Sequence, residues 1–208
     1  LGAVIGPSLA LLYLYFYPQN YKTLFFIAFI PGLFAVLAAL RLKDKTAIEQ
    51  KPKIKTSFFA LFNYWKLSPA DYKKLVTGLL IFALFNSSDV FLLLQAKQAG
   101  LDDTMVIGLY IFYNLVYALF AFPAGILADR FGLKTIFITG LALFACVYFG
   151  MAFSTHLYFF FGLFFLYGIY ASATEGISKA WVSNITSKKD TATAIGTFSG
   201  LQSICSML

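Results

Sequence analysis

The sequence predicts an all-α protein, a bundle of helices that crosses a membrane several times, and three observations lead to this fold class. Of the 208 residues, 60% are hydrophobic and 12% are charged, whereas a soluble domain carries about 25% charged residues. Apolar runs of about 20 residues, the length of a membrane-spanning helix, flank a short charged hairpin at 129–134. Basic residues gather in alternate turns, as the positive-inside rule requires.

Charge and cysteine usage exclude several classes of function. The formal net charge is +7, but most basic residues lie at 41–74, between two apolar runs. This is the cytoplasmic bias of a membrane protein rather than a nucleic-acid surface, and it also suits contact with anionic lipid headgroups. Cys146 and Cys205 lie far apart inside apolar runs, so neither a disulfide nor a metal site is predicted. There is no phosphate-binding loop, and no cofactor is implied.

Both ends of the sequence fall inside apolar helices, without the pattern of a signal peptide at the start. We therefore expect a fragment of a longer protein. The first span should end near Tyr17, and Gly6 with Pro7 predicts a bend with close helix packing, because proline removes an amide donor. The second span, 24–40, has no polar side and should face lipid.

A charged linker follows at 42–73. Ser57–Leu67 is predicted to form an amphipathic helix on the cytoplasmic membrane face, with a partner-binding helix as the alternative. Its apolar positions, spaced i, i+3, i+4 and i+7, are Phe58, Leu61, Phe62 and Trp65. Ser68 is the expected N-cap of the next helix, with Pro69 at its first helical position.

The third span, about 75–96, contains Asn86 and Asp89. Helix rise places Asp89 about 22 Å from Lys74, inside the outer part of the hydrocarbon or at its rim. One interpretation is a carboxylate that lines a central cavity and binds substrate or a proton, since intramembrane acids are costly and often functional. The other is structural, with Asp89 hydrogen-bonded to Asn86, Ser87 or a neighbouring helix where its own helix bends.

Two further spans, 105–128 and the one that starts at Leu157, carry tyrosine faces at helical spacing. Such tyrosines either pack between helices or contact a substrate. They are Tyr110, Tyr113 and Tyr117, joined by Asn114, in the first of these spans, and Tyr167 and Tyr170 in the second. Glu175 and Lys179 stand one turn apart in the favourable i, i+4 order. They are expected to pair with each other or with the charged hairpin and to form part of an inner gate, with a direct proton or substrate role as the alternative.

The hairpin between 105–128 and the featureless span 135–153 has a specific pattern. Gly125, Asp129, Arg130, Gly132 and Lys134 give G-x-x-x-D-R-x-G-x-K. This resembles the signature on the cytoplasmic loop inside each half of major facilitator superfamily transporters. The resemblance implies two six-helix halves, and it implies that the loop acid closes the cytoplasmic side by meeting the positive N-terminus of a helix from the opposite half.

The resemblance covers nearly the whole chain, which is similar to family helices five to eleven. Gly2, Gly6 and Pro7 resemble a G-x-x-x-G-P motif on helix five of exchangers in the superfamily, although the paired glycines that often follow are absent. The implied division is 1–41 as the end of the N-terminal half, 42–73 as the linker, and 74–208 as the C-terminal half. About seven spans are expected, the last one truncated.

These patterns predict a secondary transporter of a small solute that works by alternating access, coupled to protons. Its partners would be the solute, protons, the lipid of the plasma (inner) membrane and the missing N-terminal half of the same protein. A receptor or assembly subunit that keeps the fold without transporting is the alternative. An enzyme is not predicted, because a single histidine supplies no catalytic pair or metal cluster.

Overall fold

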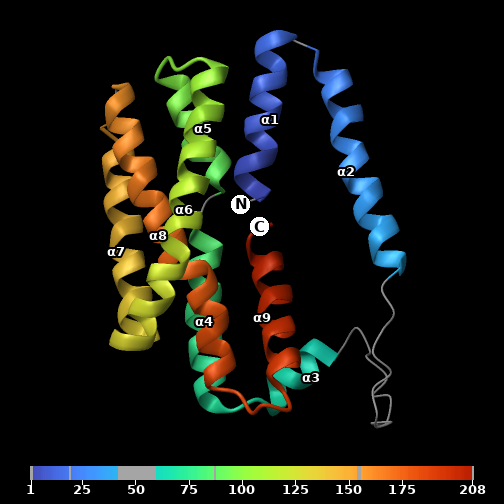
Figure 1. Ribbon diagram of the computed structural model, residues 1–208. Coiled ribbons are helices and arrows are strands. Elements are labelled where there is room, and N and C mark those ends of the chain that lie inside the picture. Colours follow the sequence, from blue (N-terminus) through green and yellow to red (C-terminus); the bar gives the residue numbers. More distant parts are fainter. Residues whose placement is uncertain (1, 19, 42–59, 87, 154–155, 208) are drawn as a thin grey trace.

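The computed structural model describes residues 2–18, 20–41, 60–86, 88–153 and 156–207, and within them every regular element is an α-helix. Figure 1 shows most of the long helices standing roughly parallel, with α2 apart from the others and the short α3 at the lower end. They are α1 Gly2–Phe16, α2 Tyr21–Arg41, α3 Ala60–Leu67, α4 Ala70–Phe85, α5 Asp89–Gln98, α6 Asp103–Phe131, α7 Leu133–Met151, α8 Leu157–Asn184 and α9 Thr191–Cys205.

Five segments of the described chain are long and apolar enough to cross a membrane. They are Tyr21–Arg41, Ala70–Gln98, Asp103–Phe131, Leu133–Met151 and Leu157–Asn184. The expected number was about seven, with the last span truncated, and the two shorter helices α1 and α9 stand beside these five segments. The helices α1 and α9 have 15 residues each, and a helix of that length rises only about 22 Å, less than the hydrocarbon thickness.

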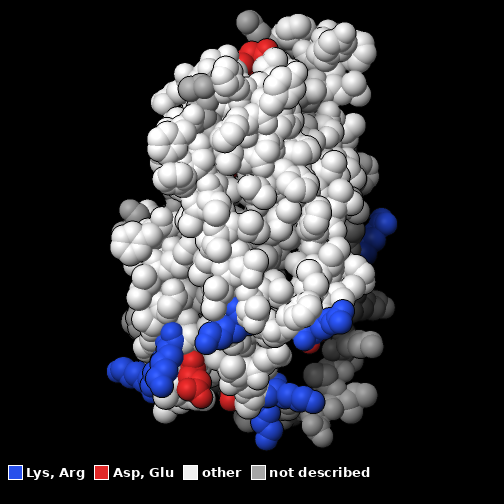
Figure 2. Space-filling view, turned by 90° about the vertical axis from the view of Figure 1, so that its left-hand side faces the viewer, with Lys and Arg blue, Asp and Glu red and all other residues white. Residues whose placement is uncertain are grey.

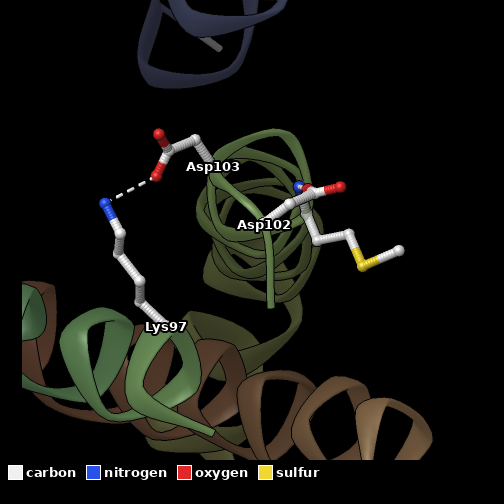
Figure 3. Close-up of polar contacts among 4 residues, drawn as sticks. Lys97, Asp102 and Asp103 are labelled. Carbon is white, nitrogen blue, oxygen red and sulfur yellow. Dashed lines mark hydrogen bonds and ion pairs between the residues drawn. The ribbon is translucent and has the colours of Figure 1, made fainter. Parts of the chain in front are cut away.

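Charge is distributed along the bundle as a membrane protein requires. In Figure 2 most basic side chains gather at the lower end, one lies at the right-hand edge about halfway up, and the broad face between the two ends is otherwise without charge. At the upper end, Lys97 pairs with Asp103 at 2.7 Å (Figure 3). The neighbouring Asp102 caps α6, because its carboxylate accepts a hydrogen bond from the Met105 amide at 2.7 Å. The basic end is the side expected in the cytosol.

The centre of the fold is α8, which packs along both α6 and α7. Three glycines allow these helices to approach closely. A Cβ atom at Gly168 would lie 2.8 Å from the Tyr113 carbonyl oxygen, and one at Gly140 would lie 2.7 Å from Thr174 Cγ2. A Cβ atom at Gly150 would meet Leu163 in the same way. In a membrane, where no hydrophobic force drives helices together, small residues at a crossing allow the close packing that holds the helices in contact.

The first two helices have a different environment. No residue of α2 is buried, as expected for a span that faces lipid. The helix α1 packs on α6, and Pro7 lies inside it, beside Ser8, whose hydroxyl donates to the Val4 carbonyl at 2.7 Å. The close packing expected at Gly6 is absent from the described part of the chain, because nothing lies within 4 Å of its Cβ position.

The short helix α3 packs onto the lower end of the bundle. Tyr72 of α4 is fully buried there and donates to the Ala194 carbonyl of α9 at 2.9 Å, with the Tyr64 ring 5.4 Å from its own. The expectation that Ser68 caps α4 is wrong. Its hydroxyl instead donates to the Trp65 carbonyl at 2.8 Å, which satisfies an end of α3, and α4 begins at Ala70. Phe58 lies outside the described residues.

Candidate functional site

The third span is interrupted in the middle, and this interruption builds the site. The helix α4 ends at Phe85, Asn86 has an extended backbone with ψ 109°, and α5 begins at Asp89. Ser88 is the N-cap of α5, and its hydroxyl accepts from the Val90 amide at 3.4 Å. Backbone outside a helix is tolerated at membrane depth where it lies inside protein or lines a cavity.

Asp89 joins three helices at this break. Its two carboxylate oxygens accept one hydrogen bond each, from the Tyr113 hydroxyl of α6 and the Tyr167 hydroxyl of α8, both at 2.5 Å. Both tyrosines are buried, and their rings lie 5.5 Å apart. Asp89 also stands in the first turn of α5, where the helix dipole favours a negative charge. We call these three residues the aspartate–tyrosine clasp.

A cavity of about 220 Å³, the central cavity, lies beside the clasp. The elements α4, α5, α7, α8 and α9 all contribute to its wall. Its aromatic part includes Phe82, Tyr167 and Tyr170, and its charged part consists of Asp89, Glu175 and Lys179. Polar side chains complete the wall, among them Asn86, Ser178 and Gln202.

Glu175 and Lys179 do not pair as expected. Within the described residues the ion pair is Lys97–Asp103, and both Glu175 and Lys179 are exposed side chains of the central cavity wall. The neighbour of Glu175 across the helix interface is Tyr117 of α6. Along α8, Glu175 lies about 12 Å below Tyr167, and Lys179 lies about 6 Å further toward the basic end.

The remaining polar residues predicted in this region divide into two groups. Asn114 is buried, and its side-chain amide donates to the Tyr110 carbonyl of its own helix at 2.9 Å. It is not part of the central cavity wall. The Tyr110 ring packs edge-on against Tyr113 at 5.5 Å. Asn86 does line the cavity, and its side-chain oxygen is buried without a hydrogen-bond partner among the described residues.

Sequence reasoning missed the contribution of α9 and the aromatic contribution of α4. Gln202 and Phe198 of α9, and Phe82 of α4, line the central cavity. The Phe82 ring lies 6.4 Å from that of Tyr170, edge to face. Phe82 is one turn before Asn86 on the same helix face, and this i, i+4 spacing is the only signal in the sequence that connects it to the site.

The charged hairpin lies at the basic end of the bundle. Asp129 and Arg130 are exposed in the last turn of α6, and Gly132 joins α6 to α7 with φ +90°. A side chain at that φ is strained, which explains the glycine. Gly125 and Asp129 line a second hollow of about 200 Å³ between α6 and α8, the inner groove, opposite Gly176. Lys134 is exposed in the first turn of α7.

No group of three histidine, cysteine or acidic residues able to hold a metal ion occurs among the residues that the structure describes. Cys146 and Cys205 are both free thiols. The central cavity itself offers carboxylates, an ammonium group, hydroxyls and aromatic rings.

Comparisons with known proteins agree with this arrangement. A family model described as Major Facilitator Superfamily matches residues 96–208. An uncharacterised MFS-type transporter of Methanocaldococcus jannaschii is 32% identical over 203 residues, which are 95% of this chain and 50% of that protein. The chain thus spans about half the length of the curated relative it matches. No solved structure matches it.

Proposed function

Because the chain belongs to the major facilitator superfamily, we propose that the complete protein is a secondary transporter that moves a small solute by alternating access. As a multi-pass integral membrane protein, it would work in the plasma membrane and draw energy from a proton gradient. Residues 74–208 would form the C-terminal half, 42–73 the cytoplasmic linker, and 1–41 the end of the N-terminal half. Together the two halves would rock around a fixed binding site.

The observation that carries this proposal is the central cavity beside a broken helix. Charged groups within a membrane span cost about 2.5–3.5 kcal/mol each on insertion scales, so such residues are rare and mark functional sites. Here two acids and one base from α5 and α8 converge on a single hollow. Discontinuous helices with polar groups at their break are typical of transporter binding sites near the bilayer midplane.

Within this site we assign different roles to the two acids. Asp89 has both oxygens occupied by tyrosine donors and holds α5 against α6 and α8. Glu175 is exposed on the cavity wall, and its neighbours are Tyr117 and Lys179. Glu175 is therefore the better placed of the two to exchange a proton or contact the solute, and Asp89 acts as a positioning residue.

Asp129 is proposed to hold the cytoplasmic side closed. It is exposed at the inner groove, where a helix N-terminus from the N-terminal half would meet it. A carboxylate at a helix N-terminus is stabilised by about 0.3–1 kcal/mol when exposed and by up to about 2 kcal/mol when partly buried. An interaction of this size suits a gate, because the transport cycle must break it repeatedly.

The test is the accessibility of a cysteine in the central cavity from the two sides of the membrane. In the complete protein, with every native cysteine including Cys146 and Cys205 changed to serine, Gln202→Cys should react with an impermeant maleimide in right-side-out and in inside-out vesicles. Adding Asp129→Asn should raise the reaction rate from the cytoplasmic side about threefold, because a neutral amide binds the helix end less well.

The matched control is Asp71→Asn, which removes another exposed acid from the same end of the bundle. It should leave both labelling rates unchanged. Labelling from one side only, in every variant, would favour the non-transporting receptor or assembly subunit and would contradict alternating access.

A further inference from the structure

We propose that the central cavity selects a cationic organic solute, whose ammonium group is held by Glu175 and whose apolar body packs against the aromatic wall. The proposal rests on the proposed function, since it names the class of solute for that same site. Three observations support it: the balance of charge in the cavity, the accessibility of Glu175, and the rings beside it.

The charge balance favours a cation. The charged residues of the cavity wall are Asp89, Glu175 and Lys179, two carboxylates against one ammonium group. The other described elements that face this hollow, α4, α7 and α9, contribute only neutral side chains to it. An anionic solute would meet a net negative wall in a region of low dielectric, where like charges repel more strongly than in water.

The two carboxylates are not equally available. Each oxygen of Asp89 receives a hydrogen bond of 2.5 Å from a buried tyrosine, so its oxygens are already engaged by the protein's own donors although its charge remains. Glu175 has no such pair of donors: Tyr117 is its neighbour on α6, and it forms no ion pair with Lys179. An exposed carboxylate in a half-polar cavity is the group that gains most from an incoming ammonium.

The third observation is the aromatic wall. The rings of Tyr167 and Tyr170 lie 5.2 Å apart, and the Phe82 ring lies 6.4 Å from Tyr170. All three line the central cavity, and Glu175 lies little more than one turn beyond Tyr170 on α8. Aromatic faces attract cations through their quadrupole, and a desolvated site strengthens that attraction. A carboxylate beside several rings therefore matches an ammonium group attached to an apolar body.

Two probes of the same shape, one cationic and one neutral, test this inference. Phenyltrimethylammonium and tert-butylbenzene differ in having a charged nitrogen or a neutral carbon at the branch point. Equilibrium dialysis with the complete protein in lipid nanodiscs should show saturable binding of radiolabelled phenyltrimethylammonium, and a several-fold excess of tert-butylbenzene should not displace it.

The variants assign the binding to Glu175. Glu175→Gln should weaken binding of phenyltrimethylammonium about tenfold, which corresponds to loss of one modest charge interaction, and Glu175→Asp should restore most of it. Lys179→Gln should strengthen binding about threefold by removing the neighbouring positive charge, a gain that a misfolded variant would not give. Asp103→Asn removes an exposed acid at the other end of the bundle and should change nothing.

Three results would overturn the inference: no saturable binding of the ammonium probe, equal competition by the neutral probe, or unchanged affinity in Glu175→Gln. These results are separate from the proposed function. If Gln202→Cys is labelled from both membrane sides while the ammonium probe fails to bind, alternating access stands and only the class of solute is wrong.

Discussion

Replacing Asp89 with leucine is expected to lower the free energy of unfolding of the complete protein by about 3 kcal/mol, because two buried hydroxyls lose their acceptor. Tyr113 and Tyr167 are 6% and 2% exposed, so water does not replace the lost carboxylate. Hydrogen bonds between membrane helices average less than 1 kcal/mol, but here the acceptor is charged and each bond is 2.5 Å long. Denaturant unfolding of the protein in detergent, with leucine and wild type compared side by side, measures the loss.

Two variants separate the clasp from a general effect of the substitution. Asp89→Asn keeps one side-chain oxygen and should lose about half as much stability. In the Tyr113→Phe background, Asp89→Leu should cost less than in the wild type, because one of the two donors is already gone. Equal costs in the two backgrounds would contradict the clasp.

The second large effect is expected at the crossing of α6 and α8. Gly168→Ala should destabilise the protein by about 2 kcal/mol, because the added methyl group must push the helices apart. The methyl group would lie 2.8 Å from the Tyr113 carbonyl oxygen and 2.8 Å from Val116 Cβ. Backbone is one of the two obstacles, so a side-chain rotation cannot relieve the contact. Thermal unfolding monitored by circular dichroism provides the measurement.

The same helix supplies the control for this substitution. Nothing lies within 4 Å of the Cβ position of Gly162, and alanine has a higher helix propensity than glycine. Gly162→Ala should therefore be neutral or slightly stabilising. If both substitutions proved neutral, the close approach of α6 and α8 at Gly168 would be wrong.

Features with a local cause were predictable from the sequence. The boundaries of α6 follow from the Asp102 cap and from Gly132, whose positive φ separates α6 from α7. The position of the charged hairpin and of the two helices beside it could therefore be predicted from residues that are neighbours in the sequence. Ser68 shows the limit of local rules, because its hydroxyl had two helix ends within reach and satisfied α3 instead of α4.

Features made by distant residues were not predictable. Asp89 and Tyr167 are separated by 78 positions along the chain, and no spacing rule connects them. Both interpretations of Asp89 contained part of the result, since it is bonded to neighbouring helices and also lines the central cavity. The break after Phe85 was suggested by the polar residues at 86–89, but whether a polar run bends a helix or ends it depends on the helices around it.

The central claim is that the signature hairpin faces the cytosol, since the orientation of every span follows from it. Lys134→Cys, in the complete protein with every native cysteine changed to serine, places one exposed thiol in that hairpin. Gln98→Cys places another in the exposed turn at the opposite end of the bundle. In intact cells an impermeant maleimide should label Gln98→Cys and leave Lys134→Cys unlabelled until the membrane is permeabilised. Labelling of Lys134→Cys from outside intact cells would contradict the account.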